Sequence, residues 1–152
     1  MLGWNKSWKR LFAILVGLLM LTGFAQMPIF KRYYIADLPG LGWTADFYFN
    51  HRFHYVLATI LILMIFFQIG RVIASGSLRY VTWFGWIKVV LWAGIIITGI
   101  LRVLKNFPDF YFNPKMVMYI DWLHLAFPFI LGLVALWGKF FKKKYLICPY
   151  ED

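Results

Sequence analysis

The chain has 152 residues, of which 62% are hydrophobic and only 14% are charged, and its formal net charge is +10. A typical soluble domain is about 45–50% apolar and about 25% charged, so this composition excludes a disordered chain and argues against a soluble enzyme. The single cysteine, Cys148, excludes an intrachain disulfide and a metal cluster held by cysteines of this chain alone. We therefore expect a small integral membrane protein whose basic charge orients its helices, with no nucleic-acid partner.

The first apolar run covers residues 11–29 and, at about 1.5 Å per residue, matches the ~30 Å hydrocarbon core of a bilayer. Lys6, Lys9 and Arg10 precede it, which is also the pattern of a signal peptide. The run is longer than a usual signal, and no small-residue cleavage site follows Gly23. We interpret it as a retained first helix.

Three further apolar runs predict helices over residues 47–70, 81–104 and 116–138. The second helix reaches back to Asp46, because the residues that follow it are aromatic and typical of a membrane interface. Lys88 lies close to the start of the third helix, so either its long side chain extends to the interface or that helix begins later. The links are too short for a soluble domain. We predict an all-α fold, a bundle of four transmembrane helices that forms one membrane domain over residues 1–152.

The distribution of lysine and arginine predicts the orientation of this bundle. With the N-terminus inside, ten of the 16 cations fall on the inner side and six on the outer side, the outer six being Lys31, Arg32, Arg52, Arg102, Lys105 and Lys115. We therefore expect both termini to lie in the cytoplasm. We expect the protein itself to lie in the inner membrane of a prokaryote, in contact with membrane lipid.

The three histidines are His51, His54 and His124, and all of them fall in the second and fourth helices, which run inward from the outer face. His54 and His124 each lie roughly 12–14 Å along the helix from the polar residue at its outer end. Two imidazoles at one depth on two helices are what a six-coordinate b-type haem near the outer face requires. His51, three residues before His54, is the alternative ligand on that helix, although a single interfacial histidine is more often an amphipathic anchor.

Small and cationic residues accompany the histidines. Ala58 follows His54 by one helical turn, and Gly23 and Gly99 mark thin places near the outer ends of the first and third helices, so a flat macrocycle can approach. Arg52 and Arg102 are predicted at the same end, where haem propionates need cationic partners. An equal alternative is that the two arginines only anchor their helices at the membrane interface.

Two further residues of the fourth helix, Asp121 and Pro128, lie close to His124 in the sequence. Asp121, one turn before His124, either orients that imidazole or is a solvated residue at the interface. Pro128 cannot donate to the carbonyl of His124, so we expect a kink just beyond the ligand.

The sequence also contains a short internal echo, since Leu21-Thr22-Gly23 ends the first helix and Ile97-Thr98-Gly99 lies near the end of the third. Each is followed by an aromatic link and a histidine-bearing helix, so the chain is either two related hairpins or shows a chance match. Together with Trp8-Lys9-Arg10-Leu11-Phe12, Arg52-Phe53-His54 with Ala58, and Leu123-His124-Leu125-Ala126, these motifs resemble the membrane cytochrome b subunits of formate dehydrogenases and nickel-iron hydrogenases. The resemblance covers most of the four-helix region.

This resemblance implies a subunit that anchors a soluble iron–sulfur and catalytic module and carries electrons between it and membrane quinone. It implies that His54 and His124 ligate the outer of the family's two b haems. The chain lacks the family's histidine at the start of the first helix, and it has Gly138 in place of a second histidine in the fourth, so we expect one haem. The family's quinone motif is not recognisable in residues 77–83, so a quinone ligand of this chain stays an alternative.

Three functions compete on these observations. The first is a non-catalytic, single-haem electron-transfer subunit of a respiratory oxidoreductase complex. The second is a haem-free membrane anchor of such a complex. The third is a small transporter or channel, which ranks last because apart from Lys88 and Gln26 the helices offer few polar residues to mark a path.

Overall fold

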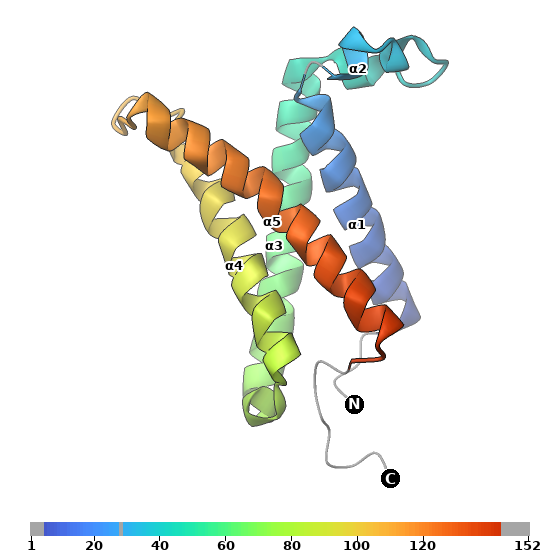
Figure 1. Ribbon diagram of the computed structural model, residues 1–152, viewed down its shortest axis with the longest axis vertical. Coiled ribbons are helices and arrows are strands. Elements are labelled where there is room, and N and C mark those ends of the chain that lie inside the picture. Colours follow the sequence, from blue (N-terminus) through green and yellow to red (C-terminus); the bar gives the residue numbers. More distant parts are fainter. Residues whose placement is uncertain (1–4, 28, 144–152) are drawn as a thin grey trace. The chain divides into compact units, whose positions relative to one another are not determined.

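The computed structural model describes residues 5–27 and 29–143, and the chain divides into two compact units, Met1–Ser75 and Gly76–Asp152. Each unit is a helical hairpin (Figure 1). Within the described residues, four helices are long and apolar enough to cross a membrane: α1 (Lys6–Ala25), α3 (Phe47–Ala74), α4 (Trp83–Leu104) and α5 (Pro114–Phe140). At most 17% of the residues in the most apolar window of each helix are buried inside the protein, which suits lipid contact.

The first unit pairs α1 with α3 (Figure 1). Between these helices the chain forms three short elements: α2 (Ile29–Arg32), η1 (Ile35–Asp37) and η2 (Gly42–Ala45). The core of this hairpin consists of Leu15, Leu57 and Met64, with Phe12, Leu18, Leu19 and Phe53 packed against them. Dispersion between such closely packed side chains is what holds helices together in lipid, where the hydrophobic effect contributes little between them.

The second unit pairs α4 with α5, and glycines on both helices allow close packing. A Cβ added at Gly94 on α4 would lie 2.8 Å from the ring of Phe127, and one at Gly138 on α5 would lie 2.5 Å from the ring of Phe84. Each helix therefore places an aromatic ring over a glycine of the other. The 3-10 turn η3 (Ser77–Tyr80) precedes α4, and Gly76 before it has a φ of 65°, a left-handed conformation that glycine adopts without strain.

The predicted helices are confirmed as elements, but their boundaries need correction. The first was predicted over residues 11–29 and runs instead over Lys6–Ala25. It starts earlier because the Asn5 side chain accepts a hydrogen bond from the amide of Trp8 at 2.8 Å. It ends earlier because Met27 precedes Pro28 in the sequence, and a residue before proline is disfavoured in helix.

The other three helices differ less from their predicted ranges. The second continues to Ala74, and Asp46 caps its start as expected, since its carboxylate accepts from the amide of Phe49 at 3.0 Å. The third begins at Trp83, later than predicted, and Lys88 directs its ammonium to within 5.3 Å of the Phe84 ring centroid. The fourth is longer at both ends, over Pro114–Phe140. Lys144 and Cys148 lie outside the described residues.

Candidate functional site

His54 on α3 faces Thr22 on α1. Nδ1 of His54 lies 2.8 Å from the Thr22 hydroxyl oxygen, and Thr22 is fully buried. The next residue, Gly23, leaves room for the ring, since a Cβ there would lie 3.6 Å from Cε1 of His54. A threonine and a glycine on α1 thus hold and accommodate one imidazole of α3.

The hydroxyl of Thr22 contacts both a carbonyl and the His54 ring. Thr22 has one hydroxyl proton and donates it to the carbonyl oxygen of Leu18 at 2.8 Å. With the hydroxyl in this orientation, its oxygen accepts from Nδ1 of His54 when Nδ1 carries the ring proton. In the neutral imidazole the lone pair is then on Nε2, and that lone pair is what a metal ion requires.

The second unit repeats this arrangement with different residues. Nδ1 of His124 on α5 lies 3.0 Å from the hydroxyl oxygen of Thr98 on α4. Thr98 donates its own proton to the carbonyl oxygen of Gly94 at 2.7 Å, so its oxygen accepts from Nδ1 of His124 when that nitrogen carries the ring proton. A Cβ at Gly99 would lie 3.3 Å from Cε1 of His124, a tighter fit than at Gly23.

We call the end of each hairpin at which its two long helices are joined the loop end. One helical turn from each threonine–histidine pair, towards the loop end, lies a second polar pair. In the first unit Nδ1 of His51 lies 3.2 Å from Oε1 of Gln26. His51 also stacks on Phe47 and packs on Tyr55, with ring centroids 5.5 Å and 4.4 Å away.

The corresponding pair of the second unit is ionic. Nε of Arg102 lies 2.9 Å from one carboxylate oxygen of Asp121, and Nζ of Lys105 lies 3.0 Å from the other. Gln26 follows Thr22 by four residues as Arg102 follows Thr98, and His51 precedes His54 by three as Asp121 precedes His124. The internal echo of the sequence therefore extends to the contacts inside each hairpin.

Other residues predicted around the site have varied surroundings. Arg52 is exposed and Ala58 is half-buried on α3. Arg102 is held by Asp121, so the predicted propionate partner already has an anionic neighbour inside its own hairpin. Thr98 occupies the hydrogen-bonding position at Nδ1 of His124 that was one of the two roles considered for Asp121.

Thr22 and Thr98 are the site residues that sequence reasoning missed. Both belong to the repeated Leu-Thr-Gly and Ile-Thr-Gly triplets, which had been noted as an echo and as part of a resemblance, with no role for the hydroxyls. The signal that could have found them is the position of the same polar residue in two otherwise apolar helices, each paired with a histidine-bearing helix.

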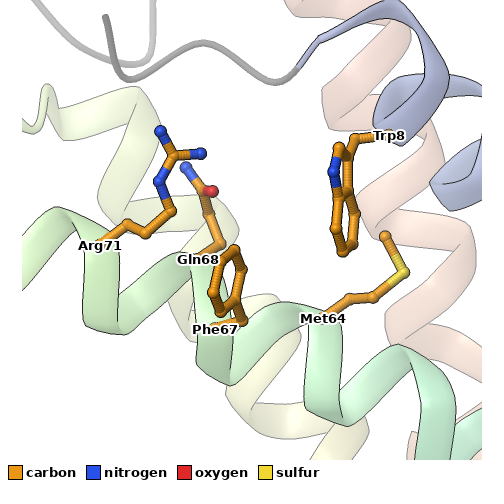
Figure 2. Close-up of a pocket in the computed structure, with 5 residues that line it drawn as sticks. All are labelled: Trp8, Met64, Phe67, Gln68 and Arg71. Atoms are coloured by element: carbon orange, nitrogen blue, oxygen red, sulfur yellow. The ribbon is translucent and has the colours of Figure 1, made fainter.

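Two cavities lie within the first unit. The smaller, about 20 Å³, is at the end opposite the loop end and has room for about one water molecule (Figure 2). Its lining residues are Trp8, Met64, Phe67, Gln68 and Arg71, and Trp8 stacks on Phe67 with ring centroids 5.9 Å apart. The larger cavity, about 200 Å³ at the loop end, is lined in part by Gln26 and Phe47, which both contact His51.

Comparisons of the chain with protein-family models, with curated proteins and with solved structures gave no match.

Proposed function

We propose that the chain is a membrane-anchoring electron-transfer subunit of a respiratory oxidoreductase complex in the inner membrane of a prokaryote. In this proposal it binds one b-type haem near the outer face, with His54 and His124 as the axial ligands. It passes electrons between an iron–sulfur or haem cofactor of a partner subunit and the quinone pool. When bound, the haem supplies one-electron transfer at its iron.

The observation that carries the proposal is the matched state of the two histidines. Each hairpin holds one imidazole whose Nδ1 faces a threonine hydroxyl, beside a glycine that leaves space for the ring. Metal-ligating histidines generally donate their other ring N–H to a fixed acceptor, and here a threonine hydroxyl is that acceptor. This donor set fits a haem with two imidazole ligands, the arrangement of an electron carrier.

The surroundings of His51 favour His54 as the ligand on α3. His51 packs between Phe47 and Tyr55 and bonds to the side chain of Gln26, whereas His54 has the threonine and glycine that recur at His124. Among the histidines described, His54 is the one that shares the threonine and glycine neighbours of His124.

The ends of the hairpins away from the loop ends support one haem and not two. Gly138 occupies the position at which the cytochrome b resemblance implies another histidine. It is buried, and a side chain there would meet the Phe84 ring at 2.5 Å. The stack of Trp8 on Phe67 fills the same end of the first hairpin (Figure 2).

The test is a reduced-minus-oxidised absorption spectrum of the purified chain, or of the complex that copurifies with it. We expect a b-type α band in the wild type, its loss in His54→Ala and in His124→Ala, and its retention in the matched control His51→Ala. All variants must first reach the membrane at wild-type levels.

A haem-free anchor is the alternative function. The threonine–histidine hydrogen bonds favour it to some degree, because polar side chains also join helices in membranes without any cofactor. This alternative predicts no α band in the intact complex and normal assembly of both histidine variants. A band lost in His51→Ala and kept in His54→Ala would instead transfer the ligand role to His51.

A further inference from the structure

We propose that Thr22 and Thr98 are positioning residues for the two axial histidines, and that their hydroxyls set the ring orientation and the donor strength of Nε2. This inference rests on the proposed function. Neither threonine would touch the iron. Each acts through the N–H of an imidazole on the neighbouring helix of its own hairpin.

Each hairpin contains a short hydrogen-bonding chain. The threonine O–H donates to a carbonyl one turn earlier, that of Leu18 or Gly94, and the threonine oxygen faces Nδ1 of the histidine. An imidazole whose Nε2 binds a metal ion carries its ring proton on Nδ1, and the threonine oxygen would accept that proton. Thr22 is 0% exposed and Thr98 is 5% exposed, so little water competes for the imidazole N–H.

The hydroxyls of Thr22 and Thr98 have a hydrogen-bond acceptor without the histidines. A buried hydroxyl is satisfied when it donates to the carbonyl four residues earlier, as both do here. Thr59, an exposed residue of α3, makes the same kind of bond, since it donates to the carbonyl of Tyr55 at 2.9 Å. The second contact of Thr22 and Thr98 therefore serves the imidazole.

The polar pair next to the threonine–histidine contact differs between the two hairpins, whereas that contact is the same in both. One turn nearer the loop end, a neutral Gln26–His51 pair in the first unit stands where an ionic Arg102–Asp121 pair stands in the second. The threonine, the glycine and the histidine are the same in both. The same hydroxyl at both imidazoles would give two histidine ligands of one haem similar donor strength.

Valine is the variant that removes the hydroxyl and keeps the β-branched shape, and serine keeps the hydroxyl. In Thr22→Val and Thr98→Val the imidazole loses its hydrogen bond to the threonine oxygen, so Nε2 becomes a weaker donor and the ferric state is less stabilised. We expect the midpoint potential to move to more positive values and haem affinity to fall about 10- to 100-fold. Thr22→Ser and Thr98→Ser should restore the midpoint potential and the haem affinity, and Thr59→Val, at an exposed threonine of α3, controls for the threonine-to-valine change itself.

The experiment measures haem per chain, midpoint potential and the low-spin ferric EPR spectrum of the full chain, purified with any copurifying subunits. Support is a positive shift with altered g values in either valine variant, rescue by serine, and no change in Thr59→Val. Valine variants with the potential and g values of Thr59→Val overturn the inference and leave the proposed function intact.

Two other outcomes also decide the matter. If neither valine variant accumulates in the membrane while Thr59→Val does, the hydroxyls are required for folding and the positioning role is overturned. If the wild-type chain in its intact complex contains no haem, the proposed function itself fails, and this inference fails with it.

Discussion

Gly23 and Gly99 have the same neighbour, a histidine Cε1, but they leave different amounts of space. A Cβ at Gly23 would be in ordinary contact at 3.6 Å, whereas one at Gly99 would lie 3.3 Å from His124, closer than most real Cβ contacts. Glycine inside a helix costs about 1 kcal/mol relative to alanine, so an alanine that fits should stabilise its helix. Whether an alanine at either position stabilises or destabilises the protein therefore depends on a few tenths of an ångström between its Cβ and the histidine ring.

We expect Gly23→Ala to be neutral or stabilising and Gly99→Ala to be less stable than Gly23→Ala by about 1 kcal/mol. The reason is that the His124 ring must shift to admit the new methyl group, which offsets the gain in helix propensity. Thermal unfolding of the two variants in the same detergent measures this difference. Equal stabilities, or a greater loss in Gly23→Ala, would contradict it.

At the scale of the elements, Asn50 ties the loop end of the first hairpin to α3. It is fully buried, and its amide nitrogen donates to the carbonyls of Trp43, Thr44 and Asp46, at 2.9, 3.3 and 2.6 Å. A side-chain amide has two N–H groups, so three carbonyls share them. One residue thereby orders η2 and its junction with α3, immediately before the turn that carries His51 and His54.

Replacing Asn50 with alanine should therefore destabilise this junction by about 1–3 kcal/mol, since buried carbonyls lose their donor. Limited proteolysis of residues 29–46 in membranes measures the effect as faster cleavage. Asn106→Ala is the control, because Asn106 is exposed and donates to the carbonyl of Arg102 at 3.2 Å. Cleavage of Asn50→Ala at the rate of the control would show that the loop end does not depend on Asn50.

At the scale of the whole molecule, four apolar helices in the described chain determine the class of protein. An even number of spans places the segments that flank them on one side of the membrane. The excess of lysine and arginine predicts that this side is the cytoplasm, since ten of the 16 cations fall there.

Reporter fusions test the orientation. Alkaline phosphatase inserted within residues 106–112 should be active in a bacterial host, because that loop is predicted outside. Green fluorescent protein fused to the C-terminus should be fluorescent, because it folds in the cytoplasm. The reverse pair of results would place the histidine layer near the cytoplasmic face and would contradict the predicted orientation.

Hydrophobic runs of membrane length were sufficient to predict four helices and their order, because a bilayer requires every backbone polar group to be satisfied within its own segment. Their ends were less predictable, as Asn5 shows, since a single side-chain cap moved the start of α1 by more than a turn. The histidines were predictable as candidates because so few polar residues share their helices. The haem and the cytochrome b resemblance stay predictions, which the histidine variants test.

Only the tertiary structure decided what the polar residues do. Thr22, Thr98 and Asp121 are each ambiguous in sequence, since a threonine can be satisfied by its own helix and an aspartate by solvent. Packing within each hairpin brings the two hydroxyls to histidine nitrogens and the carboxylate to Arg102 and Lys105. The sequence by itself determined a membrane chain with histidines on two of its apolar helices, because hydropathy is a local property. The threonine that faces each Nδ1 was decided by contacts between helices, because a hydrogen bond depends on which residue the neighbouring helix presents.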